Sequence, residues 1–102
     1  MEISKFQSLM KDLYYANDNR RGIYRTTLWL FEEMGELSHE LKKNSMEMDK
    51  KAIAEEMADI YAWVASLANL LDIDLDAAVQ QKYPNKCLKC NKNPCKCNKD
   101  LD

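Results

Sequence analysis

Residues 53–71 read IAEEMADIYAWVASLANLL, and this stretch decides the fold. Its large apolar residues recur at alternating steps of four and three, which is the spacing of a helix packed lengthwise against other helices. These positions are Ile53, Met57, Ile60, Val64, Leu67 and Leu71. The stretch therefore predicts the longest helix of a helical bundle.

The segments on either side carry helical patterns of their own. The same alternating steps appear at Ile23, Thr27, Leu30, Met34, Leu37 and Leu41. A first amphipathic helix is expected over residues 3–17, and a short fourth helix follows Asp74, a candidate N-cap, and stops before Pro84. Four helices with short connections predict an all-α fold of the four-helix bundle type.

The composition supports one helical domain and restricts its partners. The chain has 102 residues but only two glycines and two prolines, which are too few turn residues for a sheet-rich fold. Its net charge of −2 provides no global basic field for nucleic acid or an anionic membrane. No apolar run approaches the roughly 20 residues of a membrane span, and the N-terminus lacks the apolar core of a signal peptide. We therefore expect a cytoplasmic protein without a membrane or nucleic-acid partner.

The four cysteines divide the chain into two parts. All of them lie in the last sixteen residues, which separates a helical body, residues 1–83, from a Cys-rich tail, residues 84–102. A body of this size is near the limit at which a single core stabilises a fold by only a few kcal/mol. Oligomerisation would help it, and a homodimer is the simplest form.

The two central helices share an acidic pattern. Aligned by their apolar positions at an offset of 23 residues, residues 32–37 read EEMGEL and residues 55–60 read EEMADI. At about 100° per residue, Glu33 and Glu36 lie within roughly 60° of each other beside the apolar face, whereas Glu32 points away. Glu56 and Asp59 have the same relationship on the next helix. Four converging carboxylates repel one another unless a cation binds, and their oxygens favour Mg²⁺ or Mn²⁺.

Two other interpretations of these acids stay open. Glu-x-x-Glu near lysines is also the pattern of a solvated helix face. A di-iron carboxylate bundle is the second, because Glu36 and His39 have the Glu-x-x-His spacing. His39 is however the only histidine, and it lies farther from the apolar face than Glu33, so we interpret it as a surface residue.

The pattern Glu32-Glu33-x-x-Glu36, followed after 19 residues by Glu56-x-x-Asp59, resembles the MazG-like family of all-α nucleoside triphosphate pyrophosphohydrolases. The similarity covers roughly residues 1–85. It implies a Mg²⁺-dependent enzyme that cleaves a ribo- or deoxyribonucleoside triphosphate into the monophosphate and pyrophosphate. Such an activity would serve house-cleaning of the nucleotide pool.

The resemblance also implies roles for individual residues. Glu33, Glu36, Glu56 and Asp59 match the metal-binding positions, and Glu32 matches the first acid of the motif, with a supporting or second-metal role. Family members form dimers or tetramers, which implies a homodimer or a dimer of dimers. Two alternatives stay open: cleavage of a phosphoribosyl-ATP-like substrate, and a non-catalytic, zinc-bearing dimerisation or regulatory module.

Cations and aromatic residues are candidate substrate contacts. Arg21 and Lys82 are suited to phosphate, and Trp29 and Trp63 lie near the acids at helical spacing, where they can stack on a base. Each also has a plainer interpretation, as a solvated charge or as aromatic packing at a helix or dimer interface.

The tail carries four thiols within eleven residues. Cys87-x-x-Cys90 and Cys95-x-Cys97 suffice for a tetrahedral Zn²⁺ site, in which the short spacer predicts a tight knuckle. Free or redox-active thiols and disulfides are the alternatives.

Overall fold

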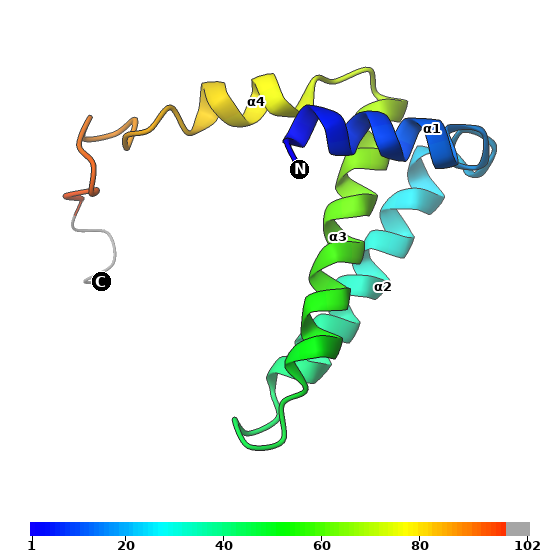
Figure 1. Ribbon diagram of the computed structural model, residues 1–102, viewed down its shortest axis with the longest axis horizontal. Helices are drawn as coiled ribbons and strands as arrows, with labels where there is room; N and C mark the ends of the chain where they lie inside the picture. The colour runs from blue at the N-terminus through cyan, green and yellow to red at the C-terminus, as the bar shows by residue number, and fades with distance from the viewer. Residues whose placement is uncertain (98–102) are drawn as a thin grey trace.

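The computed structural model describes residues 1–97 and shows four α-helices, with no strand in that range. They are α1 (Ile3–Arg21), α2 (Ile23–Leu41), α3 (Lys50–Leu70) and α4 (Leu75–Lys82). Helices α2 and α3 pack side by side as a long antiparallel hairpin, and α1 lies across one end of it (Figure 1). Helix α4 leads away from that same end toward the Cys-rich tail (Figure 1). The all-α prediction is confirmed.

Aspartate side chains cap the last two helices. Asp49 accepts hydrogen bonds from the backbone N–H groups of Lys51 and Ala52, so α3 begins at Lys50. Asp74 accepts one from the N–H of Ala77, as expected for the cap of α4. Each cap satisfies N–H groups that have no partner within the helix.

Helix α1 is longer than the sequence pattern predicted, because it continues through the polar residues 18–21 to Arg21. Arg21 forms an ion pair with Asp18 one turn earlier, with 2.9 Å between Nη1 and Oδ1, and the cations at this end complement the helix dipole. Gly22 then ends the helix with a φ of 88°, a conformation that favours glycine. Its N–H donates to the Asp18 carbonyl oxygen at 2.9 Å.

The side chain of Gln7 fastens α1 to the C-terminal end of α3 and to the turn that follows it. Its Nε2 donates to the Ile73 carbonyl at 2.7 Å, and its Oε1 accepts from the Leu75 N–H at 3.0 Å. Asn69 Nδ2 donates to the Gln7 carbonyl at 3.1 Å. One side chain thereby links α1, the turn after α3 and the first residue of α4.

The apolar core of a single chain is small. The buried hydrophobic residues among those described are Met10, Ile53, Ala65 and Ala68. Two residues of the predicted apolar faces, Met34 and Met57, are 48% and 52% exposed. Helix α1 covers the α2–α3 hairpin at one end only (Figure 1). Much of the apolar surface that the sequence predicted to lie inside a bundle therefore faces outward in one chain.

None of the helices described in residues 1–97 is long and apolar enough to span a membrane.

Candidate functional site

Three carboxylates meet between α2 and α3. Glu33 comes from α2, and Glu56 and Asp59 lie one turn apart on α3. One oxygen from each of the three lies within 4.8 Å of the others, and we call this group the acidic triad. The helical phase predicted from the sequence accounts for the arrangement, because Glu33 and Glu56 occupy equivalent positions of the repeat.

The acidic triad has an electrostatic cost when no cation is bound. A side-chain hydrogen bond with Glu56, together with burial and the negative charges of Glu56, Glu36 and Asp59, raises the pKa of Glu33 to about 7. The raised pKa means that protonation of Glu33 offsets the repulsion among these acids, at a position where a metal ion would supply the positive charge.

The remaining acids of the motif lie beside the triad. Glu36 is exposed, and its pKa is raised by the negative charge of Glu56 above all. Glu36, Glu32 and Glu56 line a second hollow of about 490 Å³ together with His39. Glu56 therefore belongs to both groups, whereas Glu36 stands outside the 4.8 Å triad in this chain.

Two buried carboxylate oxygens indicate that the acidic triad is suited to binding a cation. Oε2 of Glu33 and Oε2 of Glu56 are both buried without a hydrogen-bond partner. Leaving such atoms unpaired is costly, and a divalent cation with oxygen ligands satisfies both. The donor set is all carboxylate, which fits Mg²⁺ or Mn²⁺.

A cavity of about 440 Å³ opens beside the triad. Glu33 and Asp59 form part of its wall, and the rest comes from α1 and from the later turns of α3. The other lining residues are Met10, Tyr14, Asn17, Asp18, Arg21, Ala62, Trp63 and Ser66. An apolar and aromatic wall with carboxylates nearby is typical of a small-molecule pocket.

Arg21 is held between two tryptophans and an aspartate. Its guanidinium carbon lies 4.5 Å from the centre of the Trp29 ring and 4.9 Å from that of Trp63. The two indoles meet edge to face, with ring centroids 5.5 Å apart. Nη1 of Arg21 donates to Asp18 Oδ1 at 2.9 Å and to Thr26 Oγ1 at 3.3 Å. Of the two tryptophans, Trp63 lines the cavity, and Trp29 packs behind it against Arg21.

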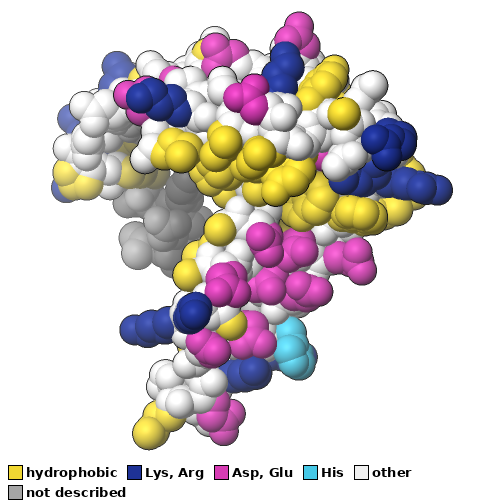
Figure 2. Space-filling model, turned by 45° about the vertical axis from the view of Figure 1, so that its right-hand side comes forward, with side chains coloured by type: hydrophobic (Ala, Val, Ile, Leu, Met, Phe, Trp, Pro, Cys, Tyr) yellow, Lys and Arg dark blue, Asp and Glu magenta, His cyan; other side chains and the backbone are white. Residues whose placement is uncertain are grey.

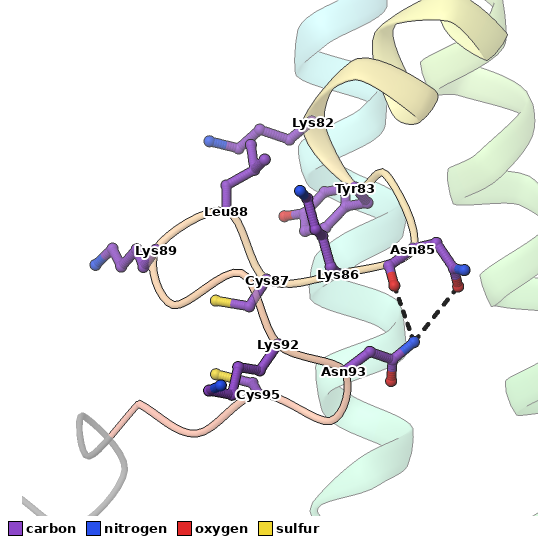
Figure 3. Close-up of a pocket in the computed structure, with 10 residues that line it drawn as sticks. All are labelled: Lys82, Tyr83, Asn85, Lys86, Cys87, Leu88, Lys89, Lys92, Asn93 and Cys95. Carbon is purple, nitrogen blue, oxygen red and sulfur yellow. Dashed lines mark hydrogen bonds between the residues drawn. The ribbon is translucent and has the colours of Figure 1, made fainter.

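Lys82 lies elsewhere, at the end of α4. It lines a cavity of about 570 Å³ in the tail, together with Lys86, Lys89 and Lys92. Figure 3 shows these lysines around the loop that carries Cys87 and Cys95. In one chain, Lys82 is therefore not brought to the acidic triad.

The four cysteines of the tail converge. The Sγ atoms of Cys87, Cys90, Cys95 and Cys97 all lie within 4.8 Å of one another. Backbone N–H groups point at two of them: Lys96 N donates to Cys90 Sγ at 3.3 Å, and Cys97 N donates to Cys95 Sγ at 3.4 Å. Hydrogen bonds from the backbone of Cys90 and Lys89 lower the pKa of the Cys87 thiol to about 6.

Sequence reasoning missed the contribution of α1 to the cavity. Asn17 is the last residue of the first helix predicted from the sequence, and Asp18 lies just beyond it. Asp18 is in fact only 1% exposed. The signal that could have revealed it is the Asp18–Arg21 spacing, which is that of an i, i+3 ion pair continuing the helix.

The fold and the site define an all-α protein with a carboxylate centre beside a mixed polar and aromatic cavity. Residues 21–91 match the family described as the MazG nucleotide pyrophosphohydrolase domain. The chain therefore belongs to the MazG family. No curated protein matches it in sequence.

Proposed function

We propose that this protein is a Mg²⁺-dependent nucleoside triphosphate pyrophosphohydrolase that converts a (d)NTP into the (d)NMP and pyrophosphate. The single observation that carries the proposal is the acidic triad, with its two buried, unpartnered carboxylate oxygens, opening onto a cavity of about 440 Å³ in a chain of the MazG family. Removal of standard or damaged nucleotides from the pool is the role that this reaction would serve.

Glu33, Glu56 and Asp59 would hold the cation, and Glu36 would join them after a rotation of its exposed side chain. Bound there, a divalent cation would neutralise phosphate charge and activate water. Glu32, which shares the neighbouring hollow with Glu36, would support these ligands or a second ion. Holding the carboxylates together on two packed helices fixes their positions before the substrate arrives.

The cavity residues would orient the nucleotide. Trp63 offers an aromatic surface to a base, and Trp29 keeps Trp63 in place through their edge-to-face contact. Arg21 lines the same cavity, where its guanidinium would supply positive charge while it stays bonded to Asp18. Lys82 would reach a phosphate only at a site shared between chains, because it lies at the end of α4 and lines a cavity other than the one beside the triad.

The deciding experiment separates pyrophosphate from orthophosphate. We expect the protein with Mg²⁺ to release pyrophosphate from members of a panel of NTPs, dNTPs and phosphoribosyl-ATP. Glu56→Gln and Asp59→Asn should lower kcat/KM by at least the roughly 10–100-fold that loss of a metal-site partner costs. Glu55→Gln is the matched control, since Glu55 is the exposed neighbour outside the triad.

Several results would decide against this function. Absence of turnover across the panel, with no Mg²⁺-dependent rise in Tm, would favour a non-catalytic dimerisation or regulatory module. Turnover of phosphoribosyl-ATP alone would identify the protein as a phosphoribosyl-ATP-type pyrophosphohydrolase. Equal losses in Glu55→Gln and Glu56→Gln would disconnect the activity from the triad.

We also propose that the active form is a homodimer, or a dimer of dimers, in which a second chain covers apolar surface. Tyr24, Leu28 and Phe31 follow one another on α2 at steps of four and three and are 75%, 44% and 65% exposed. Figure 2 shows a band of hydrophobic side chains directly above a group of acidic ones. Exposed apolar surface of this kind marks a contact with another protein.

For the tail we propose a structural Zn²⁺ held by Cys87, Cys90, Cys95 and Cys97. Four sulfurs bound to one Zn²⁺ at about 2.3 Å form a tetrahedron with edges of about 3.8 Å. The Cys87 and Cys97 sulfurs lie 3.8 Å apart, which is the distance of co-ligands and too long for a covalent bond.

The rest of the tail offers little else to fix its conformation. Leu88 is its one large apolar side chain in the described residues, and it is 53% exposed. Fixing the backbone of each residue costs about 1–2 kcal/mol, so a segment without a core needs another source of stability. Metal binding supplies one, because its free energy becomes folding free energy.

Metal analysis of freshly reduced protein tests the zinc site. We expect stoichiometric zinc, and replacement by Co²⁺ should give the visible absorption of tetrahedral thiolate coordination. Cys95→Ser with Cys97→Ser should abolish both signals, whereas Glu56→Gln should leave them unchanged. Iron in place of zinc, or no tightly bound metal, would contradict the proposal.

A further inference from the structure

Asp18 is a buried acid, and one of its two carboxylate oxygens has no hydrogen-bond partner. It is 1% exposed, and its Oδ1 accepts the hydrogen bond from Arg21 at 2.9 Å. Its Oδ2 is buried and has no hydrogen-bond partner. The bond at Oδ1 and the helical backbone of α1 fix the carboxylate, so the direction of the free oxygen is fixed as well.

Asp18 belongs to the wall of the cavity that contains Glu33 and Asp59. Trp63 lines the same cavity, and Arg21, which Asp18 holds, packs on the Trp63 ring. A nucleotide with its phosphates at the acidic triad would therefore extend its base toward the α1 wall. Asp18 is part of that wall, and its Oδ2 is buried without a hydrogen-bond partner, so a donor group on the base would complete its hydrogen bonding.

We propose that Asp18 determines base specificity by accepting a hydrogen bond from the exocyclic amino group of cytosine or adenine. This inference rests on the proposed function. The preferred substrates are then nucleoside triphosphates that have an amino group on the base, over those that have a carbonyl at the same position.

The chemistry of the carboxylate sets the direction of the preference. A carboxylate oxygen accepts hydrogen bonds and does not donate them. The amino groups of cytosine and adenine donate, whereas the carbonyl of uracil or hypoxanthine presents lone pairs. A base with the carbonyl would leave Asp18 Oδ2 unpaired and bring two acceptors together, and unpaired buried groups carry a large penalty.

Matched substrate pairs test the proposal in the unmodified protein. The pairs dCTP with dUTP, and dATP with dITP, differ at the exocyclic group. We expect kcat/KM to favour the amino member of each pair by at least about tenfold, which corresponds to about one hydrogen bond. Equal values within both pairs, or preference for the carbonyl members, would overturn the proposal and leave the pyrophosphohydrolase function standing.

Substitution of Asp18 separates base reading from a structural role. Asp18→Asn keeps the shape and adds an amide donor, so the dCTP to dUTP ratio should fall to one or below. A merely structural role would lower both rates and leave the ratio unchanged, which would count against the proposal. Asp12→Asn, an exposed position on the same helix, should keep the original ratio. Thermal shifts with dCMP and dUMP in the absence of metal provide the same comparison without catalysis.

Discussion

Glu33 and Glu36 lie one turn apart on α2, yet their surroundings differ. Glu33 has a buried oxygen without a partner and a pKa raised to about 7, whereas Glu36 is exposed to solvent. The repeat places both on the same flank of the helix, but α3 covers only one of them. Depth below the surface, and not spacing alone, therefore distinguishes the two acids.

The stability of the metal-free protein should depend on pH through Glu33. The pKa of Glu33 is raised from 4.5 to about 7, so protonated Glu33 stabilises the fold at low pH and this contribution is lost as pH rises through about 7. In EDTA, the Tm of the wild type relative to that of Glu33→Gln should therefore fall between about pH 5 and about pH 8. Thermal melts of both proteins across this range measure the difference.

The comparison with Glu33→Gln isolates this group from the tail. The pKa of Cys87 is lowered to about 6, so its contribution to the stability of the fold is lost as pH falls, which is the opposite direction. This contribution is the same in the wild type and in Glu33→Gln. Addition of Mg²⁺ should remove the pH dependence in the wild type alone. A constant difference across the range would mean that Glu33 keeps its ordinary pKa.

The sequence predicted the helical phase of the acidic triad but missed Asp18. Glu33, Glu56 and Asp59 belong to regular repeats, in which 100° per residue sets the direction of each side chain. Asp18 contributes to the cavity through the angle at which α1 crosses the hairpin. That angle depends on Gly22 and on the contacts of Gln7, which no local pattern contains.

At the scale of the helices, the two glycines provide a matched pair of tests. Gly22 has a φ of 88°, and Gly35 lies inside α2; at both, a Cβ would have no neighbouring atom within 4 Å. Gly22→Ala should lower the free energy of unfolding by about 1–3 kcal/mol, because φ 88° with ψ 165° is a region that essentially only glycine adopts. Gly35→Ala should raise it by about 0.5–1 kcal/mol, because alanine favours the helix.

Denaturant unfolding with both variants measures these changes. Because a Cβ meets free space at both positions, the opposite signs would come from backbone conformation alone. A neutral Gly22→Ala would mean that the junction between α1 and α2 relaxes to another conformation.

The helices themselves were largely predictable, and their ends were less so. Asp74 was identifiable as a cap because its side chain and the residues after it form a local signal. The predicted end of α1 came too early because residues 17–21 are polar, and the pattern of apolar residues contains no information there. The ion pair of Asp18 with Arg21 carries the helix to Gly22.

At the scale of the molecule, the predicted apolar rows run along α2 and α3, but a single chain leaves many of their residues exposed. Met34 and Met57 lie in the predicted apolar rows and are about half exposed. A pattern of apolar residues predicts which side of a helix avoids water, and it does not say whether the same chain covers that side.

This exposure leads to a test of the proposed dimer. Leu28→Glu with Phe31→Glu should convert a dimer to a monomer in light scattering, because charges in an apolar interface lose their hydration. The Tm should also lose its dependence on protein concentration. Met46→Glu, at an apolar position 94% exposed in the connection between α2 and α3, should leave the mass unchanged. A wild-type protein that is monomeric at all concentrations while hydrolysing nucleotides would refute the dimer.

The bonds of Gln7 have a consequence for the order of events during synthesis. Their partners Asn69, Ile73 and Leu75 lie 62 to 68 residues further along the chain. Helix α1 leaves the ribosome before the other helices of residues 1–97, yet Gln7 acquires these partners only after 62 to 68 further residues have been made. The α2–α3 hairpin needs no such delay, since its two helices are neighbours in sequence. The acids can therefore meet before residues 69–75 are made, whereas the Gln7 bonds that fasten α1 to this end of α3 cannot form until then.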